Sequence, residues 1–117
     1  MIATTQQFEA DILAGRLKQG MSFQQKCWAL TARIPAGSVA TYGDIAAKLG
    51  SRAYRAVGSA MNANPYAPVV PCHRVVGSDG ALTGFAGGLP KKRRMLAGEG
   101  VGFRGERVDL ARHRARL

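Results

Sequence analysis

Residues 41–62 read TYGDIAAKLGSRAYRAVGSAMN, and this stretch predicts two consecutive helices. The first is expected at Thr41–Leu49 and ends at Gly50, a residue type that often stops helices. The second is expected at Ser51–Asn62, with Ser51 as its N-cap. Two helices joined by a very tight turn in a basic chain are typical of helix-turn-helix domains, which bind DNA. Helical hairpins also occur in many other folds, so this pattern alone leaves the function open.

The second of these helices combines small residues with two arginines, Arg52 and Arg55. Small residues such as Gly58 and Ser59 let a helix backbone approach a neighbour closely. That neighbour is either another helix of the core or a nucleic-acid groove toward which Arg55 projects. The composition of the helix does not decide between them.

The charge of the chain is strongly unbalanced. Its 117 residues include 17 Lys and Arg but 7 Asp and Glu, a formal net charge of +10. Such a surface attracts polyanions, so nucleic acid is the leading partner and an anionic membrane surface is the second. No apolar run approaches the ~18 residues of a membrane span, and Met1–Gln7 lacks the features of a signal peptide. We expect a cytoplasmic protein with no membrane partner.

The remaining segments complete a small, mainly α-helical domain. Ser22 and Gln25 form a capping-box pattern before a helix expected at Ser22–Ile34, which buries Cys27. Val75–Leu82 is typical of a β-hairpin, and we therefore predict a three-helix, winged helix-turn-helix-like domain with a short hairpin wing. The expected parts are an N-terminal accessory segment at 1–21 with a helix at Thr4–Gly20, the domain itself at 22–103 with a basic helix at Pro90–Ala97, and a basic, partly mobile tail at 104–117.

The most reactive pattern in the chain is a thiol beside an imidazole, in Pro71-Cys72-His73-Arg74. A thiolate is a nucleophile and a neighbouring His favours it, so Cys72 is a candidate nucleophile and His73 its base. On the dipeptide alone, a small buried Cys beside a core His is the simpler explanation. Neither a C-x-x-C nor an H-x-x-x-H spacing occurs, so we expect no metal site. The acidic residues that are candidates to orient the base are Asp44, Asp79, Glu99, Glu106 and Asp109.

Several motifs, taken in order, resemble one known family. Pro71-Cys72-His73-Arg74-Val75 followed by Gly84-Phe85-Ala86-Gly87-Gly88-Leu89 is similar to the active-site signature of the O6-alkylguanine-DNA alkyltransferases. The upstream motifs that follow the same family's pattern are Phe23-Gln24-Gln25-Lys26, Ile34-Pro35-Ala36-Gly37, Thr41-Tyr42-Gly43 and Arg55-Ala56-Val57-Gly58. The resemblance covers Ser22 to Gly100, and the collinear motifs make it highly specific.

The resemblance implies a chemistry for the active-site segment. Cys72 is expected to accept the alkyl group of a flipped O6-alkylguanine as a thioether, without a cofactor, so that each molecule acts once. His73, held by Glu99, is expected to act as a base through a water, and Asn64 to be the hinge residue that orders the adjacent turn. The residues implied in binding the base and its alkyl group are Tyr42, Met61, Val75, Phe85 and Ala86.

The resemblance also implies how DNA is held. A base inside a duplex is out of reach of a protein thiol, so it has to be flipped out. Arg55 is expected to enter the base stack where the guanine left, while the helix that carries it lies in the minor groove. The residues expected to contact DNA are Tyr42, Arg52, Arg55, Gly58, Ser59 and Arg74.

Two features distinguish this chain from a typical full-length member of that family. Full-length members carry a further N-terminal domain, whereas residues 1–21 precede Ser22 here. Short relatives, the alkyltransferase-like proteins, have Trp or Ala in place of the nucleophile, and they bind the lesion without transfer and recruit nucleotide excision repair. Phe85 stands where Tyr is common, which keeps the ring and loses a hydroxyl.

Three functions therefore stay open at the level of sequence. The first is a monomeric, single-turnover methylated-DNA–[protein]-cysteine S-methyltransferase acting on double-stranded DNA that contains O6-alkylguanine. The second is a non-enzymatic protein that binds such lesions and works with nucleotide excision repair proteins. The third is a winged-helix transcription factor with an inert Cys72, which would prefer a DNA sequence irrespective of guanine alkylation.

Overall fold

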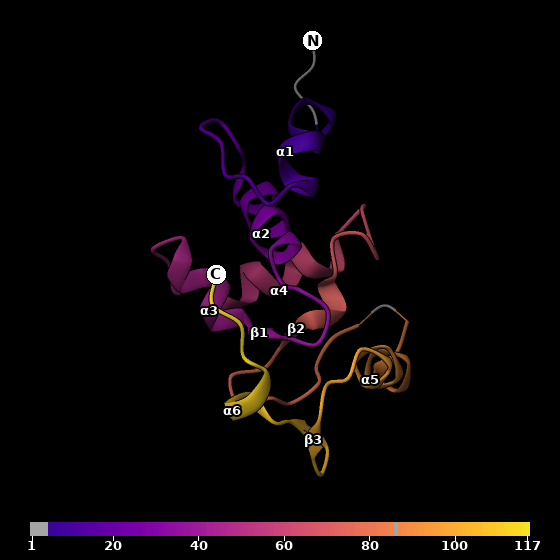
Figure 1. Ribbon diagram of the computed structural model, residues 1–117. Helices are drawn as coiled ribbons and strands as arrows, with labels where there is room; N and C mark the ends of the chain where they lie inside the picture. Colours follow the sequence, from indigo (N-terminus) through magenta and orange to yellow (C-terminus); the bar gives the residue numbers. More distant parts are fainter. Residues whose placement is uncertain (1–4, 86) are drawn as a thin grey trace.

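Three helices form the centre of the molecule (Figure 1). They are α2 (Phe23–Ala32), α3 (Tyr42–Lys48) and α4 (Tyr54–Asn62). The structure is a computed structural model that describes residues 5–85 and 87–117. The indole N–H of the buried Trp28 donates to the Ala60 carbonyl at 2.7 Å, which ties α2 to α4. The predicted mainly α-helical, helix-turn-helix architecture is confirmed.

Capping boxes begin α2 and α3. The Ser22 hydroxyl accepts from the Gln25 backbone N–H at 3.1 Å, and the Gln25 side chain accepts from the Ser22 N–H at 2.8 Å. Thr41 and Asp44 form the same reciprocal pair before α3, at 3.0 Å in each direction. These bonds satisfy N–H groups that the first turn of a helix leaves without partners. The predicted Ser22–Gln25 capping box is confirmed.

The start of α4 differs from the prediction. Ser51 is not the N-cap of this helix, because its hydroxyl accepts from the Ala53 N–H at 2.9 Å and Ala53 itself precedes the first helical residue. A short hydroxyl side chain that closes its own local turn competes with helix formation at that point. The turn between α3 and α4 is therefore longer than the sequence suggested, and α4 begins at Tyr54.

Two short strands lie next to the three helices (Figure 1). β1 (Ala40–Thr41) and β2 (Val75–Val76) pair in parallel, with Ala40 opposite Val75. The predicted hairpin at Val75–Leu82 is therefore wrong in its pairing, although its turn forms and the Gly77 N–H donates to the Ala81 carbonyl at 2.9 Å. Val75 packs into the core of the three helices and Val76 into a second apolar cluster. A strand buried on both faces suits parallel pairing inside the fold rather than an exposed wing.

The antiparallel hairpin of this structure lies nearer the C-terminus. It consists of β3 (Phe103–Arg104) and β4 (Arg107–Val108). Together with α5 (Leu89–Gly98) it covers the second apolar cluster, whose buried members are Val39, Val76, Leu96, Val101 and Val108. Gly80 joins this hairpin to the turn after β2, because the Val108 N–H donates to the Gly80 carbonyl at 2.9 Å.

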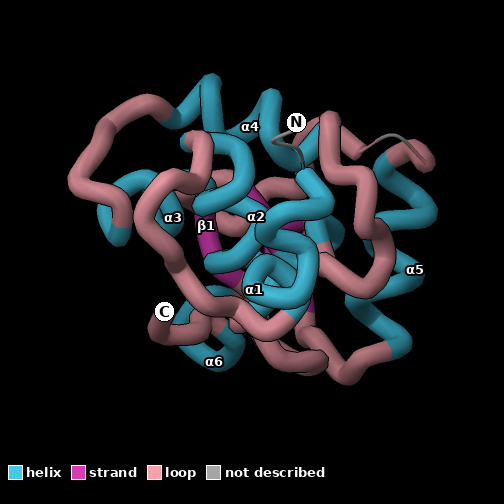
Figure 2. The backbone as a smooth tube through the Cα atoms, turned by 90° about the horizontal axis from the view of Figure 1, so that it is seen from above, coloured by secondary structure: helices cyan, strands magenta, loops and turns pink. Residues whose placement is uncertain are grey.

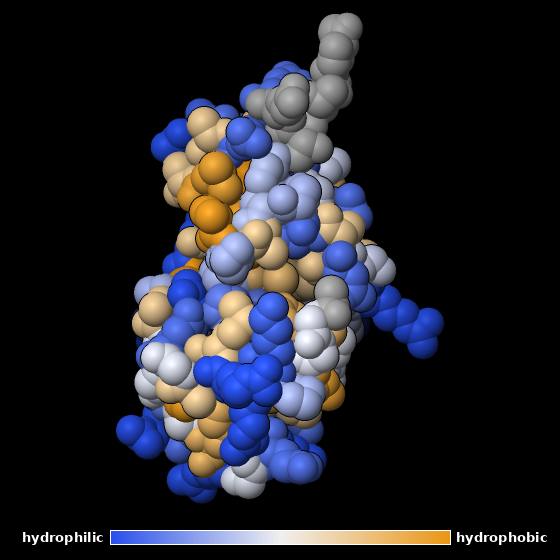
Figure 3. Space-filling model, turned by 90° about the vertical axis from the view of Figure 1, so that its right-hand side faces the viewer, coloured by the Kyte–Doolittle hydropathy of each residue, from blue (hydrophilic) through white to orange (hydrophobic). Residues whose placement is uncertain are grey.

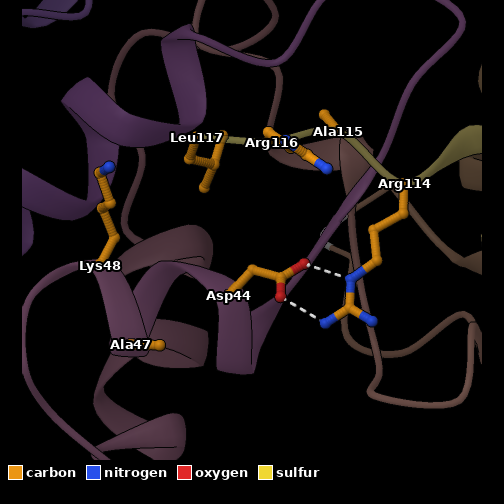
Figure 4. Close-up of a pocket in the computed structure, with 7 residues that line it drawn as sticks. All are labelled: Asp44, Ala47, Lys48, Arg114, Ala115, Arg116 and Leu117. Carbon is orange, nitrogen blue, oxygen red and sulfur yellow. Dashed lines mark hydrogen bonds and ion pairs between the residues drawn. The ribbon is translucent and has the colours of Figure 1, made fainter.

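Residues 104–117 are packed against the domain, which differs from the partly mobile tail predicted. After α6 (Leu110–His113), Val39 exchanges two backbone hydrogen bonds of 2.8 Å with His113 and Ala115. Arg114 donates to both carboxylate oxygens of Asp44 on α3, at 3.0 and 2.5 Å. Figure 4 shows this ion pair at the edge of the cleft between α3 and the C-terminal residues. The basic C-terminal segment is thus attached to both β1 and α3.

The N-terminal helix is much shorter than the predicted Thr4–Gly20, whose first residue lies outside the described part of the chain. A 3₁₀ turn, η1 (Thr5–Phe8), leads into α1 (Glu9–Leu13). The chain leaves the helix at Gly15, which has a φ of +75° and whose carbonyl accepts from Arg33 at 2.7 Å. Of the apolar side chains in this segment, Ile12 is fully buried, while Leu13 and Leu17 are exposed.

The elements spread along one long axis. α1 lies at one end and the β3–β4 hairpin at the other (Figure 1), while α3 and α5 lie on opposite sides of the two short strands in both Figure 1 and Figure 2. Strongly hydrophilic side chains stand out in the lower half of Figure 3, the half that carries α5, whose Lys91, Arg93 and Arg94 are exposed. Within residues 5–85 and 87–117, no helix is long and apolar enough to cross a lipid bilayer.

The contact between Gly80 and β4 can be tested by adding one carbon atom. A Cβ on Gly80 would lie 2.5 Å from the Val108 carbonyl oxygen, at a φ of +87°. Gly80→Ala is therefore expected to destabilise the fold by about 2–4 kcal/mol. Gly50→Ala is the matched control, because Gly50 has a φ of +67° and no atom within 4 Å of an added Cβ; it should cost about 1–2 kcal/mol. Urea unfolding measures both, and equal losses would contradict the tight contact with β4.

Candidate functional site

Cys72 lies in a short 3₁₀ helix, η2 (Cys72–Arg74), directly before β2. The Cys72 N–H donates to the Val70 carbonyl at 2.9 Å and the Arg74 N–H to the Pro71 carbonyl at 2.8 Å, which fixes the turn. The thiol of Cys72 is free and half-buried, whereas His73 is 3% exposed. The turn therefore holds the imidazole in the interior and leaves the thiol accessible from one side.

His73 meets a carboxylate at the end of α5. Its Nε2 lies 3.1 Å from Oε2 of Glu99. Burial lowers the pKa of His73 below its usual value, and Glu99 opposes this only in part, so the imidazole is neutral near pH 7 and can accept a proton. The other acidic candidates lie elsewhere. Asp44, Asp79 and Asp109 each form an ion pair with an arginine, and Glu106 is exposed on the surface.

Arg74 holds the same carboxylate from the other side. Its Nε and Nη2 donate to the two oxygens of Glu99 at 2.9 and 2.5 Å, and its Nη1 donates to the Ile34 carbonyl at 2.8 Å. The hydrogen bonds from Arg74, followed by that from His73, hold the pKa of Glu99 below its usual value. The guanidinium is thus fully engaged within the protein, and the DNA contact of Arg74 stays a prediction. Arg74 positions Glu99.

Glu99→Gln tests this network. We expect a loss of about 1–3 kcal/mol at pH 7, because a neutral amide leaves the Arg74 guanidinium without its counter-charge. The folded state depresses the Glu99 pKa, so the carboxylate's contribution is complete above its ordinary value of 4.5 and is lost as pH falls through the lower folded-state value. Urea unfolding of both proteins across this range should show the difference shrink in acid. A difference independent of pH would contradict the assignment.

Asn64 connects the end of α4 to the segment that carries Cys72. Its Nδ2 donates to the Val70 carbonyl at 2.8 Å, and its Oδ1 accepts from the Tyr66 N–H at 2.9 Å. Val70 precedes both η2 and β2, so its carbonyl group is not part of the strand pairing. Asn64 thus hydrogen-bonds to two points of the irregular connection, Tyr66 and Val70, and its role as a hinge residue stays a prediction.

Lys92 is a charged residue of this site that the sequence prediction did not include. Its side chain is fully buried, and its Nζ donates to the Thr83 carbonyl at 2.8 Å and lies 6.0 Å from the centre of the Phe85 ring. Burial lowers the pKa of Lys92 to about 8, and the charge of Cys72 acts in the opposite direction. The ammonium and the thiol therefore lie within electrostatic reach of each other.

The structure describes four of the five residues predicted to bind the base and its alkyl group. Met61 and Val75 are buried, and the Met61 sulfur lies 3.5 Å from the Thr31 hydroxyl. Phe85 is half-buried on the glycine-rich loop, beside Lys92. Tyr42 is held by that loop, since its hydroxyl donates to the Thr83 carbonyl at 3.3 Å and accepts from the Thr83 hydroxyl at 3.1 Å. Ala86 lies outside the described residues.

The exposed face of α4 carries the predicted DNA contacts. Arg55 and Ser59 are exposed on this helix and Arg52 on the turn before it. A Cβ on Gly58 would meet no atom within 4 Å, so packing between helices does not require this glycine. Beside this face lies a hollow of about 310 Å³, formed with the loop around Thr83 and Gly84. The free space over Gly58 fits a helix that a large partner approaches closely.

Comparison with known proteins decides the family. A family model described as the DNA binding domain of 6-O-methylguanine DNA methyltransferase matches residues 22–101. The chain belongs to this family.

Two methyltransferase relatives illustrate how far the similarity extends. The methylated-DNA–protein-cysteine methyltransferase of Methanosarcina barkeri is 52% identical over 79 residues, which are 67% of this chain and 50% of the relative. The protein of the same name from Salmonella typhimurium is 51% identical over 82 residues, which are 69% of this chain and 48% of the relative. The chain spans about half the length of the curated relatives it matches.

Two solved structures are similar to this chain. OGT of Mycobacterium tuberculosis, in complex with DNA, has a TM-score of 0.65 and 40% identity, covering 81% of this chain and 65% of that one. Atl1 of S. pombe, in complex with damaged DNA containing O6-carboxymethylguanine, has a TM-score of 0.69 and 29% identity, covering 81% of this chain and 95% of that one.

One feature of the sequence indicates that Lys92 is buried in this methyltransferase-family domain. Lys92 and Leu96 are four residues apart, so they share one face of α5, and both are buried. The run Lys91-Lys92-Arg93-Arg94 lies in the basic helix predicted at Pro90–Ala97; Lys91, Arg93 and Arg94 are exposed, whereas Lys92 is buried. The helical spacing is therefore a better guide to burial than the charge of the run.

Proposed function

We propose that this chain flips O6-alkylguanine out of duplex DNA and transfers the alkyl group irreversibly to Cys72. The observation that supports this most is a free, half-buried thiol next in sequence to the buried His73, which Glu99 meets, in a site that also holds the buried Lys92. An inert core cysteine needs neither an acceptor for its proton nor a buried cation nearby. A reactive thiolate needs both.

In the proposed reaction, the Cys72 thiol gives its proton to His73 through a water. The Cys72 Sγ then attacks the alkyl carbon on O6, so that an S–C bond forms while the C–O6 bond breaks. The electron pair of the broken bond stays with the guanine, which takes a proton back from His73. Glu99 stabilises the imidazolium between these steps, and the buried Lys92 ammonium supplies a positive charge near the reacting groups. The thioether does not reverse, so each molecule reacts once.

The DNA-binding part of the proposal assigns roles to α4 and the loops around it. Arg55 fills the gap left in the base stack, and Gly58 and Ser59 let α4 approach the minor groove. Tyr42 contacts the flipped guanine, while Met61, Phe85 and Ala86 line the pocket for the base and its alkyl group. The net charge of +10 supports binding through phosphates, which weakens as salt rises.

A second candidate function is recognition of the lesion without transfer, followed by recruitment of nucleotide excision repair. One observation favours it: the similarity to Atl1, in a complex with DNA containing O6-carboxymethylguanine, extends over 95% of that chain. Cys72 and its surroundings favour transfer instead, because a protein that only binds has no use for an activated nucleophile.

One titration separates the two functions. A duplex with a single O6-methylguanine is mixed with rising amounts of protein, and the remaining lesion is counted after digestion to nucleosides. Transfer predicts the loss of one lesion per protein molecule and no further turnover. Persistent binding with every lesion intact would exclude transfer and support recognition. A duplex without the lesion is the control for binding by charge alone.

A further inference from the structure

Two tyrosines, one from each helix of the helix-turn-helix, face the same hollowed surface. Tyr42 on α3 and Tyr54 on α4 both line the hollow beside Arg55 and Gly58. They also line a second hollow, which reaches Gly43 and Ser78. The two hollows therefore share both rings, and Arg55 lies at the edge of the first.

Tyr54 differs from the other aromatic side chains at the centre of the fold. It is 53% exposed, whereas Trp28 is 5% exposed and packs edge-on against Tyr66. The Tyr54 ring nevertheless packs against the protein on one side, because its Cε1 lies 3.7 Å from the position that a Cβ on Gly43 would take. One edge of the ring thus rests on the first turn of α3, while much of its surface stays open to a partner.

The neighbours of Tyr54 indicate what that partner is. The exposed Arg52 and Arg55 flank it, and within residues 5–85 and 87–117 neither guanidinium makes an ion pair. Cations attract phosphates, and an open aromatic ring offers a stacking surface to a base that has lost its neighbour. A DNA strand interrupted by a flipped nucleotide offers both.

We propose that Tyr54 contacts the damaged strand, stacking against the nucleotide next to the flipped guanine. This inference rests on the proposed function. Tyr42, on the other side of the hollow, is tied to Thr83 and so forms a fixed wall, whereas the open ring of Tyr54 is available to the flanking nucleotide. Arg55 enters the gap, and Tyr54 holds the strand beside it. Tyr54 is a DNA-contacting residue and takes no part in the proton transfers at Cys72.

Two substrates and three variants test this role. The substrates are a duplex containing O6-methylguanine and the free base O6-benzylguanine, which needs no DNA contact. The variants are Tyr54→Ala, Tyr54→Phe, which keeps the ring, and Leu13→Ala as a control that removes an exposed apolar side chain on α1. The rate of transfer is measured for each protein with each substrate, and the affinity for the lesion duplex is measured separately.

We expect Tyr54→Ala to lower the rate with the duplex by about 5- to 150-fold, the range for one lost base–aromatic stack. Its rate with the free base should stay at the wild-type level, and Tyr54→Phe should restore reaction with the duplex. A wild-type rate of Tyr54→Ala on the duplex, or equal losses with both substrates, would overturn the inference. If the unaltered protein transfers nothing from either substrate, the proposed function fails; the affinity of Tyr54→Ala for the lesion duplex then still decides the contact.

Discussion

Replacing Cys72 by serine is expected to abolish alkyl transfer and to leave lesion binding and folding intact. The change exchanges one atom in a half-buried side chain, so little packing is lost. A serine hydroxyl gives up its proton far less readily than a thiol, and its oxygen is a much poorer nucleophile than a thiolate sulfur. We expect the transfer rate to fall by at least about 10⁴-fold, the scale on which removal of a nucleophile acts. The checks are peptide mass for transfer and band shift for binding.

Cys27 provides the matched control for this substitution. It is fully buried on α2, and burial raises the pKa of its thiol to about 12, so it is not nucleophilic at neutral pH. Cys27→Ala should lose some stability by opening a small cavity, while each folded molecule transfers as the wild type does. Transfer that persists in Cys72→Ser, or a methyl group found on Cys27, would contradict the assignment of the acceptor.

Replacing Lys92 by methionine is expected to raise stability and lower activity together. Methionine fills a similar volume without a charge, so the cost of burying the ammonium disappears, while the Thr83 carbonyl keeps its bond from Tyr42. We expect unfolding to require about 1–3 kcal/mol more at pH 7. Transfer should slow by about 10²-fold, as when one positioned charge or donor is removed from an active site. Urea unfolding and the rate with a lesion duplex measure the two effects.

The same substitution has a signature in the pH dependence of stability. The folded state lowers the Lys92 pKa from 10.5 to about 8, so between these values the unfolded chain binds more protons than the folded one. The contribution of Lys92 to the free energy of unfolding therefore rises with pH across this window and does not change with pH below it. The difference in unfolding free energy between Lys92→Met and wild type should shrink from pH 8 to 10.5. A difference that does not change with pH would contradict burial of the ammonium.

Local signals predicted the helices better than their connections. The capping residues Ser22 and Thr41 bond to groups three positions away, so a short window of sequence contains the whole interaction. The parallel pairing of Ala40 with Val75 joins distant parts of the chain and leaves no local pattern, which is why Val75–Leu82 looked like a self-contained hairpin. The docking of Arg114 on Asp44 was missed for the same reason.

The candidate site was predictable where a motif carried it and not where packing decided it. The Cys72 segment is contiguous, and the resemblance named Glu99, which the structure brings to His73. The role of Arg74 depends on what surrounds its guanidinium, and only the fold shows that Glu99 and the Ile34 carbonyl occupy it. Lys92 is identified by its burial, which a run of basic residues conceals.

The most direct test of the account is the mass of the peptide that contains Cys72. The protein is incubated with a duplex carrying one O6-methylguanine, digested with a protease and analysed by mass spectrometry. The account predicts that the Cys72 peptide gains one methyl group in place of one hydrogen, in step with the loss of lesions from the DNA. A Cys72 peptide of unchanged mass, with the protein folded and bound to the lesion, would contradict it.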